Sequence, residues 1–426
     1  MSDEFKFDWV IVEKLAGKRA PDTVPRGPGT APMGDSPTAR GPGMAPMGAN
    51  PTFDDADLVA ATPNMRKETM TVAQADETLR SEKVSATLVD MPICLIEPAS
   101  RAESGAAPDK MAWGIGDLGA DKSPFTGRDV VVAVLDTGID AGHCAFDGVK
   151  LVCQDFTGEG VHDTNGHGTH CAGTIFGRDV GGVRIGVARG VQTALIGKVL
   201  GNNGGSTQAL VKALHWAQYH GADVISMSLG MDFPGYLEHL LRDPRLKPRK
   251  AASIALEAYR LNLEMFNKLS TSVIGVPGVL EGSIVVGAAG NESDIPNYTI
   301  AASLPANALE FVSVAALAPG VGNAYALAPF SNVGAKLGAP GTGVWSAKSG
   351  GGLTPMDGTS MAGPHVAGAA CLWIEQMQAE VESVNASDVI ERLRNSAASL
   401  MPGIRPEVIK WGRVQAPQRS ATSPGA

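Results

Sequence analysis

Residues 129–140 read DVVVAVLDTGID, and this stretch decides the fold. Its apolar run has the length of a buried strand, and an acidic residue and a turn-forming Gly follow it at once. Strands of this kind that alternate with helices are typical of parallel sheets covered on both faces. The sequence therefore predicts a doubly wound α/β fold with a mostly parallel sheet. Further strands are expected at 191–200, 222–229 and 283–289, and helices at 206–220, 251–268 and 360–377.

The composition excludes several classes of protein. The chain has 426 residues, 44% of them hydrophobic and 19% charged, which is ordinary for a globular protein. Its 35 basic and 44 acidic residues give a net charge of −9, so we expect no nucleic acid as a partner. Five cysteines are too few for a disulfide-dense secreted scaffold.

The N-terminus, MSDEFKFDWV, carries acidic residues where a secretory signal would have a basic and then an apolar region. We therefore expect no conventional signal peptide, and a location in the cytoplasm or export by another route. The most apolar long window, 270–290, is interrupted by Pro277 and Glu281. No membrane span is expected.

The region before residue 111 divides into three parts. Residues 1–16 form a short strand-like segment, and 17–65 a linker expected to be disordered, because 20–52 alone holds eight prolines and six glycines. Residues 66–110 hold a small unit and a connector, with a strand expected at 68–72, a helix at 73–83 and a strand-like run at 84–97. This unit is too short for a core of its own, so it should dock on the larger domain or pair with the apolar run 5–12. At the other end, 419–426 is expected to be a disordered tail.

Four residues with side chains suited to catalysis lie in Gly-rich stretches at the expected ends of strands or helices. Asp136 follows the first strand, His167 lies in NGHGTHCAGTI, Asn291 in VVGAAGNES, and Ser360 in DGTSMAGPHVAGAA. Taken singly, each has another explanation. Asp136 could be a structural carboxylate at a strand end, His167 a buried histidine with its hydrogen bonds satisfied, and Ser360 a helix N-cap. Asn291 matches a glycosylation acceptor pattern, as do Asn297 and Asn385. The α/β-hydrolase elbow is disfavoured because Ala362 stands where that motif needs Gly.

Taken together, the motifs DTGID, HGTHCAGT, SMSLG, AAGN and GTSMAGPHVAG occur in one order and end in WGRVQAP. From residue 113 to 418 the chain resembles the subtilisin-like serine peptidases, or subtilases. The resemblance implies a peptidase domain at 111–418 and a serine endopeptidase with an acyl-enzyme mechanism. It implies Ser360 as nucleophile, His167 as base, Asp136 as the residue that orients the base, and Asn291 with the Ser360 N–H as the oxyanion hole.

The same resemblance implies how an extended polypeptide substrate is held. One strand would be Ser228, Leu229 and Gly230, an opposite wall Ala288, Ala289 and Gly290, and an edge for peptide pairing Gly204, Gly205 and Ser206. None of these wall residues is acidic, which weakens any expectation of cleavage after Arg or Lys. We expect a monomer.

The chain departs from the family pattern in two places. The usual calcium site has an acid where Ala145 stands and a longer loop than 177–190, so that site is expected to be absent and no cofactor is expected. Extra chain at 231–250 carries a cluster of five basic residues and is interpreted as a solvated loop, the alternative being a rim of the cleft. More extra chain follows at 270–281.

Residues 66–105 resemble, weakly, the subtilase propeptide, which acts as folding aid and intramolecular inhibitor. The protein is then expected to be a self-processing precursor, or zymogen, cut within 99–110; the alternative is a permanent N-terminal extension. Two other functions are alternatives. A metal hydrolase would use His162, His167 and His170 as ligands, but these lie on a Gly-rich loop. A catalytically silent scaffold is disfavoured because the chain has the residue expected at all three triad positions and at the Asn position of the oxyanion hole.

Overall fold

The computed structural model describes residues 5–13, 64–100, 108–274, 280–320, 325–381, 384–399 and 404–418. Most of the predicted linker, part of the predicted connector and the predicted C-terminal tail lie outside these ranges. Within the described residues, no helix is long and apolar enough to cross a membrane.

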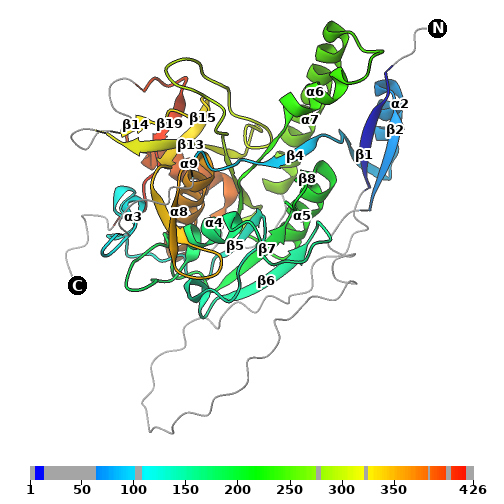
Figure 1. Cartoon of the computed structure of the whole chain (residues 1–426). Coiled ribbons are helices and arrows are strands. Elements are labelled where there is room, and N and C mark those ends of the chain that lie inside the picture. The colour runs from blue at the N-terminus through cyan, green and yellow to red at the C-terminus, as the bar shows by residue number, and fades with distance from the viewer. Residues whose placement is uncertain are drawn as a thin grey trace.

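The centre of the molecule is a nine-stranded sheet of order β19-β15-β13-β12-β9-β5-β7-β6, with β14 paired to β13 (Figure 1). Every pairing in it is parallel except β13 with β14. This confirms the predicted mostly parallel sheet. The strands are β5 (Val131–Asp136), β6 (Lys150–Asp155), β7 (Thr193–Lys198), β9 (Val224–Met227), β12 (Ile284–Ala288), β13 (Val312–Pro319), β14 (Tyr325–Leu327), β15 (Ala335–Pro340) and β19 (Ile409–Arg413).

Helices cover both faces of this sheet, and strand β5 shows why. Its side chains alternate between faces: Val132 and Val134 belong to one buried cluster, Ala133 and Leu135 to another. The first cluster includes α4 (His167–Phe176), α8 (Thr359–Glu380) and α9 (Ala386–Ser396), and the second α5 (Thr207–Tyr219) and α7 (Pro248–Ile274). The doubly wound fold is therefore confirmed. Smaller elements are α3 (Trp113–Asp117), the 3₁₀ helix η1 (Cys144–Phe146), and the paired strands β11 (Leu280–Glu281) with β18 (Val384–Asn385) and β16 (Val344–Ala347) with β17 (Leu353–Met356).

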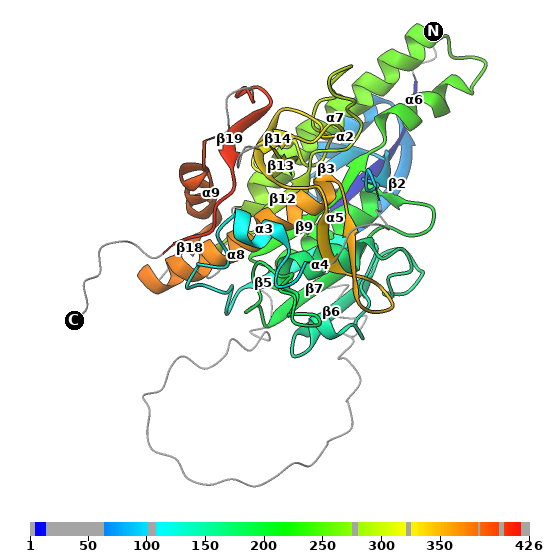
Figure 2. The ribbon, with the colours of Figure 1, turned by 60° about the vertical axis from the view of Figure 1, so that its left-hand side comes forward.

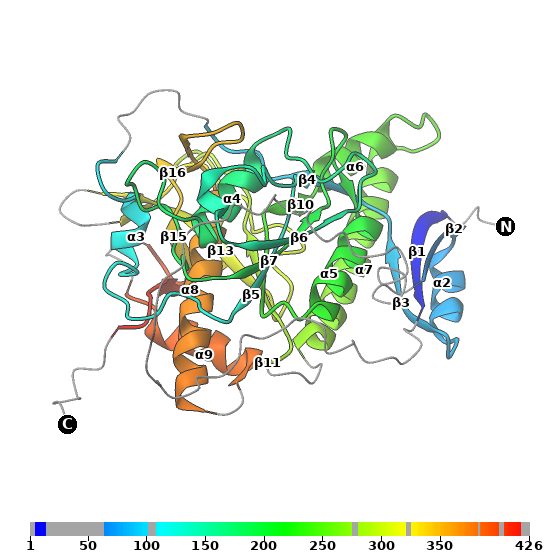
Figure 3. The same cartoon turned by 90° about the horizontal axis from the view of Figure 1, so that it is seen from below.

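The N-terminal unit is a separate three-stranded sheet. Strand β1 (Phe7–Glu13) lies between β2 (Met65–Met70) and β3 (Val84–Val89) and is antiparallel to both. Helix α2 (Val72–Leu79) begins at a capping box formed by Thr71 and Gln74. Figure 3 shows this unit beside α5 and α7, and its apolar side chains share one buried cluster with them. The early apolar run thus pairs with the unit, and the unit docks on the larger domain.

Two stretches differ from their predicted secondary structure. The run 84–97 is not one strand: it ends as β3 at Val89 and resumes as β4 (Pro92–Leu95), which belongs to another sheet. The stretch 231–250 is not a loop, because it holds α6 (Phe233–Leu241) and the start of α7. Asp232 caps α6 by accepting a hydrogen bond from the Gly235 N–H. In Figure 2, α6 and the adjoining end of α7 project from the body of the molecule.

Candidate active site

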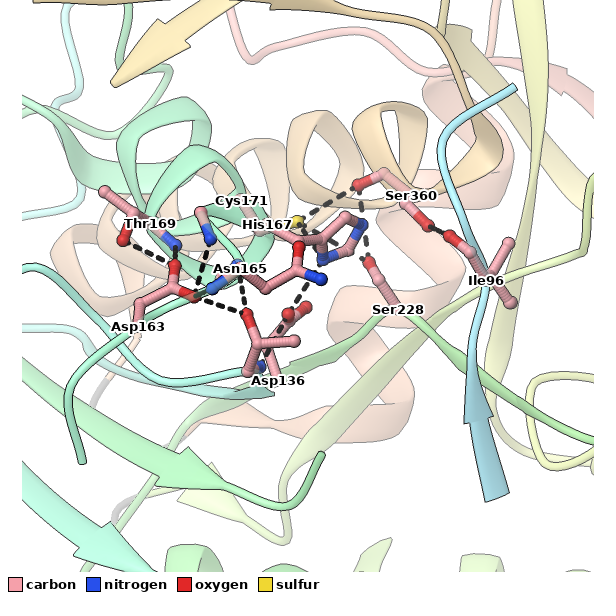
Figure 4. Close-up of polar contacts among 12 residues, drawn as sticks. Ile96, Asp136, Asp163, Asn165, His167, Thr169, Cys171, Ser228 and Ser360 are labelled. Atoms are coloured by element: carbon pink, nitrogen blue, oxygen red, sulfur yellow. Dashed lines mark hydrogen bonds and ion pairs between the residues drawn. The ribbon is translucent and has the colours of Figure 1, made fainter. Parts of the chain in front are cut away.

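The carboxyl end of β5 brings Asp136 against His167, the first residue of α4 (Figure 4). Asp136 Oδ1 lies 2.8 Å from His167 Nδ1 and also accepts a 2.7 Å hydrogen bond from the Thr137 N–H. Both side chains are buried, with at most 2% of either exposed. The position of Asp136 at a strand end and of His167 at a helix start fixes this pair with little side-chain freedom.

His167 has the two nitrogens that a general base needs. Nδ1 is bonded to Asp136, which favours the tautomer with its proton there, while Nε2 is buried and has no hydrogen-bond partner among the described residues. Burial alone would lower the pKa of His167, but the charge of Asp136 raises it well above the ordinary value. A proton taken up at Nε2 is therefore stabilised by Asp136.

A second buried carboxylate, Asp163, connects the two halves of this pair, and the sequence analysis did not single it out. Its Oδ1 accepts hydrogen bonds from the Thr137 hydroxyl and the Gly166 N–H, and its Oδ2 from the N–H and hydroxyl of Thr169. Burial would raise the pKa of Asp163, but hydrogen bonds, led by those of Thr169, hold that pKa below its ordinary value. Asp163 stands three residues before Gly166, the N-cap of α4, and an Asp close to a helix start is a common acceptor for the free backbone N–H groups there, a signal that could have revealed it.

Ser360 lies in the first turn of α8, one residue after Thr359, and the N-cap is Gly358. The interpretation of Ser360 as an N-cap is therefore wrong. The N–H groups in the first turn of a helix have no carbonyl acceptor within the helix, so the Ser360 N–H is available to a ligand. The hydroxyl donates a 2.9 Å hydrogen bond to the carbonyl oxygen of Ile96.

The carbonyl of Ser360 has unusual partners because of Pro364. In a regular helix the N–H four residues on would bind this oxygen, but proline has none. Instead the Ser228 hydroxyl lies 3.3 Å and the Cys171 sulfur 3.4 Å from it. Burial raises the pKa of the Cys171 thiol, so the thiol keeps the proton that it donates. The two side chains together satisfy a carbonyl that the helix leaves open.

Asn291 follows β12 and is oriented by Thr359. Its Oδ1 accepts hydrogen bonds from the Thr359 N–H at 2.8 Å and from the Thr359 hydroxyl at 2.9 Å. This leaves the Nδ2 donor to face outward, where it binds the carbonyl oxygen of Glu97 at 2.8 Å. The preceding Gly290 has φ +115°, and a Cβ there would lie 2.2 Å from Asn332 Nδ2, so only Gly fits.

The residues predicted to hold substrate flank strand β4. The small sheet has the order β10-β4-β8, where β10 is Leu229–Met231 and β8 is Gly205–Ser206, and β4 is antiparallel to both. Gly230 faces Cys94, and an added Cβ on Gly230 would lie 3.5 Å from the Ile96 side chain. The third predicted group, Ala288 to Gly290, lies on the Ser360 side, since the Gly290 N–H donates to the Thr359 hydroxyl.

Residues 92–100, here called the cleft segment, thus lie across Ser360. On one side of Ser360 the Ile96 N–H donates to the Ser228 carbonyl at 3.4 Å. On the other side the Ala99 N–H donates to the Asp357 carbonyl at 2.8 Å, and Ser100 forms a bridge with Asp357. The chain's own peptide is therefore held by backbone hydrogen bonds on both sides of the Ser360 hydroxyl.

Within the cleft segment, the candidate nucleophile and the candidate oxyanion donor bind different carbonyls. Ser360 Oγ binds that of Ile96, and Asn291 Nδ2 that of Glu97. Attack on a peptide bond requires both groups at one carbonyl. In this arrangement the segment is bound but neither carbonyl is placed for attack.

The histidine set of the metal-hydrolase alternative is not assembled. His170 Nε2 lies 2.9 Å from the Val344 carbonyl, and burial lowers the pKa of His170 to about 3. The group of three potential metal ligands found in the described chain is Asp136, His167 and Cys171, whose ligand atoms lie within 4.8 Å of one another. Asp136 and His167 in this group already bind each other through Oδ1 and Nδ1.

Comparison with known proteins agrees with this geometry. The family model described as "Subtilase family" matches residues 127–412, which include all four candidate residues. The chain belongs to the subtilase family. This subtilase is 34% identical over 297 residues to subtilisin DY of Bacillus licheniformis, covering 68% of this chain and 92% of that relative. It is 33% identical over 258 residues to the major intracellular serine protease of Bacillus subtilis, covering 58% and 68%. It also matches subtilisin-like protease 6 of Trichophyton rubrum at 32% identity over 280 residues, where it spans 56% of the relative.

Proposed function

We propose that this serine endopeptidase cleaves peptide bonds through Asp136, His167 and Ser360. His167 Nε2 removes the hydroxyl proton as Ser360 Oγ attacks the substrate carbonyl, and the new oxyanion is held by Asn291 Nδ2 and the Ser360 N–H. His167 then gives the proton to the leaving amine. Water hydrolyses the acyl-enzyme by the same steps in reverse order. The observation that carries this proposal is the buried Asp136–His167 bond with Nε2 left open.

The substrate proposed is an extended stretch of polypeptide. Strand β4 is bound by backbone pairing with β8 and β10, and this pairing does not depend on side-chain identity. A substrate would pair with Gly204, Gly205 and Ser206 on one side and with Ser228, Leu229 and Gly230 on the other. Ala288, Ala289 and Gly290 would wall the side chain next to the scissile bond.

The protein's own N-terminal segment is proposed as an intramolecular inhibitor. The support is the cleft segment, which holds the substrate strands while presenting consecutive carbonyls to Ser360 and Asn291. The residue after Glu97 is Pro98, which has no N–H and restricts the backbone before it. The part of the segment opposite Ser360 is 96–98, just before the stretch 99–110 where cleavage was expected.

We further propose that the usual calcium site of the family is absent. Ala145 is fully buried, and its carbonyl accepts the Arg178 N–H at 2.7 Å. The guanidinium of Arg178 binds the carbonyls of Phe176, Arg189 and Val191. These three carbonyls are therefore bound by a positive side chain instead of a cation. Adding calcium should raise the Tm by less than about 10 °C, and a larger rise would reveal a tightly bound ion.

A labelling and activity experiment tests the triad. A fluorophosphonate should label wild-type protein at Ser360, and Ser360→Ala or His167→Ala should each lower casein hydrolysis on the order of a millionfold, as in subtilisin, while the protein stays folded. Ser387→Ala, an exposed serine on α9, is the matched control and should keep full activity. A folded Ser360→Ala protein with a hundredth of the wild-type rate would refute the assignment.

Processing is tested separately by N-terminal sequencing. If the N-terminal segment is a cleaved propeptide, wild-type protein should accumulate with a new N-terminus between Ala99 and Met111, and Ser360→Ala should persist at full length. Wild-type enzyme that is fully active with its original N-terminus would show that the segment is a permanent extension.

A further inference from the structure

The N-terminal sheet depends on a strand that comes from far away in the sequence. Strands β2 and β3 both pair with β1 and not with each other. On one side Asp8 pairs with Thr69, and on the other Trp9 pairs with Val89. Residues 14–64 separate β1 from β2 in the chain. The space between β2 and β3 is therefore a slot for one extended strand, which residues 5–13 fill.

The slot is apolar and deep. Trp9 is 2% exposed, and Val10 and Ile11 are fully buried. The Trp9 indole N–H also donates a 2.9 Å hydrogen bond to the Met70 carbonyl. A ligand for this slot is thus an extended peptide with a run of apolar residues and backbone groups free on both edges.

The slot is joined to the cleft segment by a very short connection. β3 ends at Val89 and β4 begins at Pro92. The first linking residue, Asp90, donates its N–H to the Asp8 carbonyl at 2.7 Å, so β1 itself holds the root of the cleft segment. The second, Met91, is bound by the Thr207 hydroxyl at the start of α5.

We propose that the space between β2 and β3 is a peptide-binding site whose occupancy by residues 5–13 holds the cleft segment over Ser360. Without the strand, β2 and β3 have unpaired facing edges, and Asp90 loses one of the bonds that position β4. The cleft segment then leaves the substrate strands more often. The proposal extends the function proposed above by adding a control site remote from the triad.

The first experiment uses full-length variants. Val10→Pro removes a backbone N–H from the central strand, where proline is not tolerated. We expect its initial rate on a fluorogenic peptide to rise at least tenfold above wild type. Lys6→Pro is the matched control, because Lys6 is exposed and precedes β1, and it should behave as wild type. Trp9→Ala, a milder change, should give an intermediate rate.

Rescue in trans follows from the slot. A synthetic peptide of residues 5–13, FKFDWVIVE, should bring the rate of Val10→Pro back toward the wild-type rate. The same peptide with Pro at position 10 should not. Failure of the first peptide to restore low activity in an activated variant would overturn the proposal.

A second readout does not require catalysis. In the Ser360→Ala background, hydrogen exchange at the amides of Ile93 to Ile96 should be at least tenfold faster in Val10→Pro than in Lys6→Pro, and the peptide should slow it again. Amides of β12 and β13 should be unchanged, which shows that the main sheet is folded. Equal exchange in both variants would overturn the proposal. Changed exchange in this background, together with no peptide hydrolysis by the Val10→Pro protein that retains Ser360, would instead overturn the proposed peptidase function.

Discussion

Replacing Cys171 and Ser228 by Ala, singly and together, should reveal how the turn that carries Ser360 is held. Each single change leaves the other donor at the Ser360 carbonyl, so we expect each to lower the free energy of unfolding by about 0.5–1.5 kcal/mol. The double change leaves a buried carbonyl with no side-chain donor, because Pro364 supplies no N–H. An unsatisfied buried group costs about 1–3 kcal/mol. The loss in free energy of unfolding in the double variant should therefore exceed the sum of the two single losses by at least about 1 kcal/mol.

The assay is thermal unfolding in the Ser360→Ala background, which keeps the carbonyl and prevents self-digestion. A coupling of about 1 kcal/mol corresponds to roughly 2–4 °C in Tm for domains of 150–250 residues, and somewhat less for a larger one. Adding Pro364→Ala to the double variant restores an N–H four residues on and should recover part of the loss. Cys371→Ala, a buried thiol about three turns further along α8, should show no coupling with Ser228→Ala. Additivity within about 0.3 kcal/mol for Cys171 and Ser228 would refute the reasoning.

Three further predictions concern the reaction. Asn291→Leu should lower kcat by roughly 10² to 10³ and leave KM nearly unchanged, because the amide acts on charge that exists only in the transition state; steady-state kinetics that show only a KM effect would contradict it. Asp136 raises the pKa of His167, and His167 acts as a base only when it is unprotonated. Asp136→Asn should therefore move the acidic limb of the residual pH–rate profile to lower pH. A shift of that limb to higher pH would contradict the role of Asp136. Asp163→Asn should lower kcat by about tenfold or more with KM little changed, because an amide N–H₂ cannot accept from Thr169, and an effect on KM alone would argue against a positioning role.

The strands and helices of the large domain could be predicted because their patterns of apolar residues are clear. The run before Asp136 is apolar at every position, as a strand buried on both faces requires, and the structure places it in the interior of the parallel sheet, between β9 and β7. Helix α5 was expected at 206–220 and spans Thr207–Tyr219. The structure brings Asp136 and His167 into contact, as the order of the motifs predicts.

Other features depend on contacts that no local pattern records. The break between β3 and β4 at Asp90 arises because the chain leaves one sheet for another, although both parts are equally apolar. The basic residues at 231–250 suggested a loop, but the apolar Tyr236 and Leu240 lie at helical spacing and pack on the domain, so α6 forms. The role of Asp163 could not be predicted because its side-chain partners are Thr137, which follows β5, and Thr169, which lies in α4, and only the fold brings both to one carboxylate.

Strand β4 is covalently linked to the domain whose substrate strands it occupies. This link determines how its competition with substrate depends on protein concentration. A tethered competitor has a local concentration fixed by its connection, commonly of millimolar order for short links, rather than by the amount of protein in solution. Diluting the protein therefore leaves the fraction of blocked clefts unchanged, whereas a separate inhibitor chain would dissociate. Only a substrate present well above its own binding constant, or an event that alters the tether, can shift the balance. Latency of this kind is a property of each single molecule.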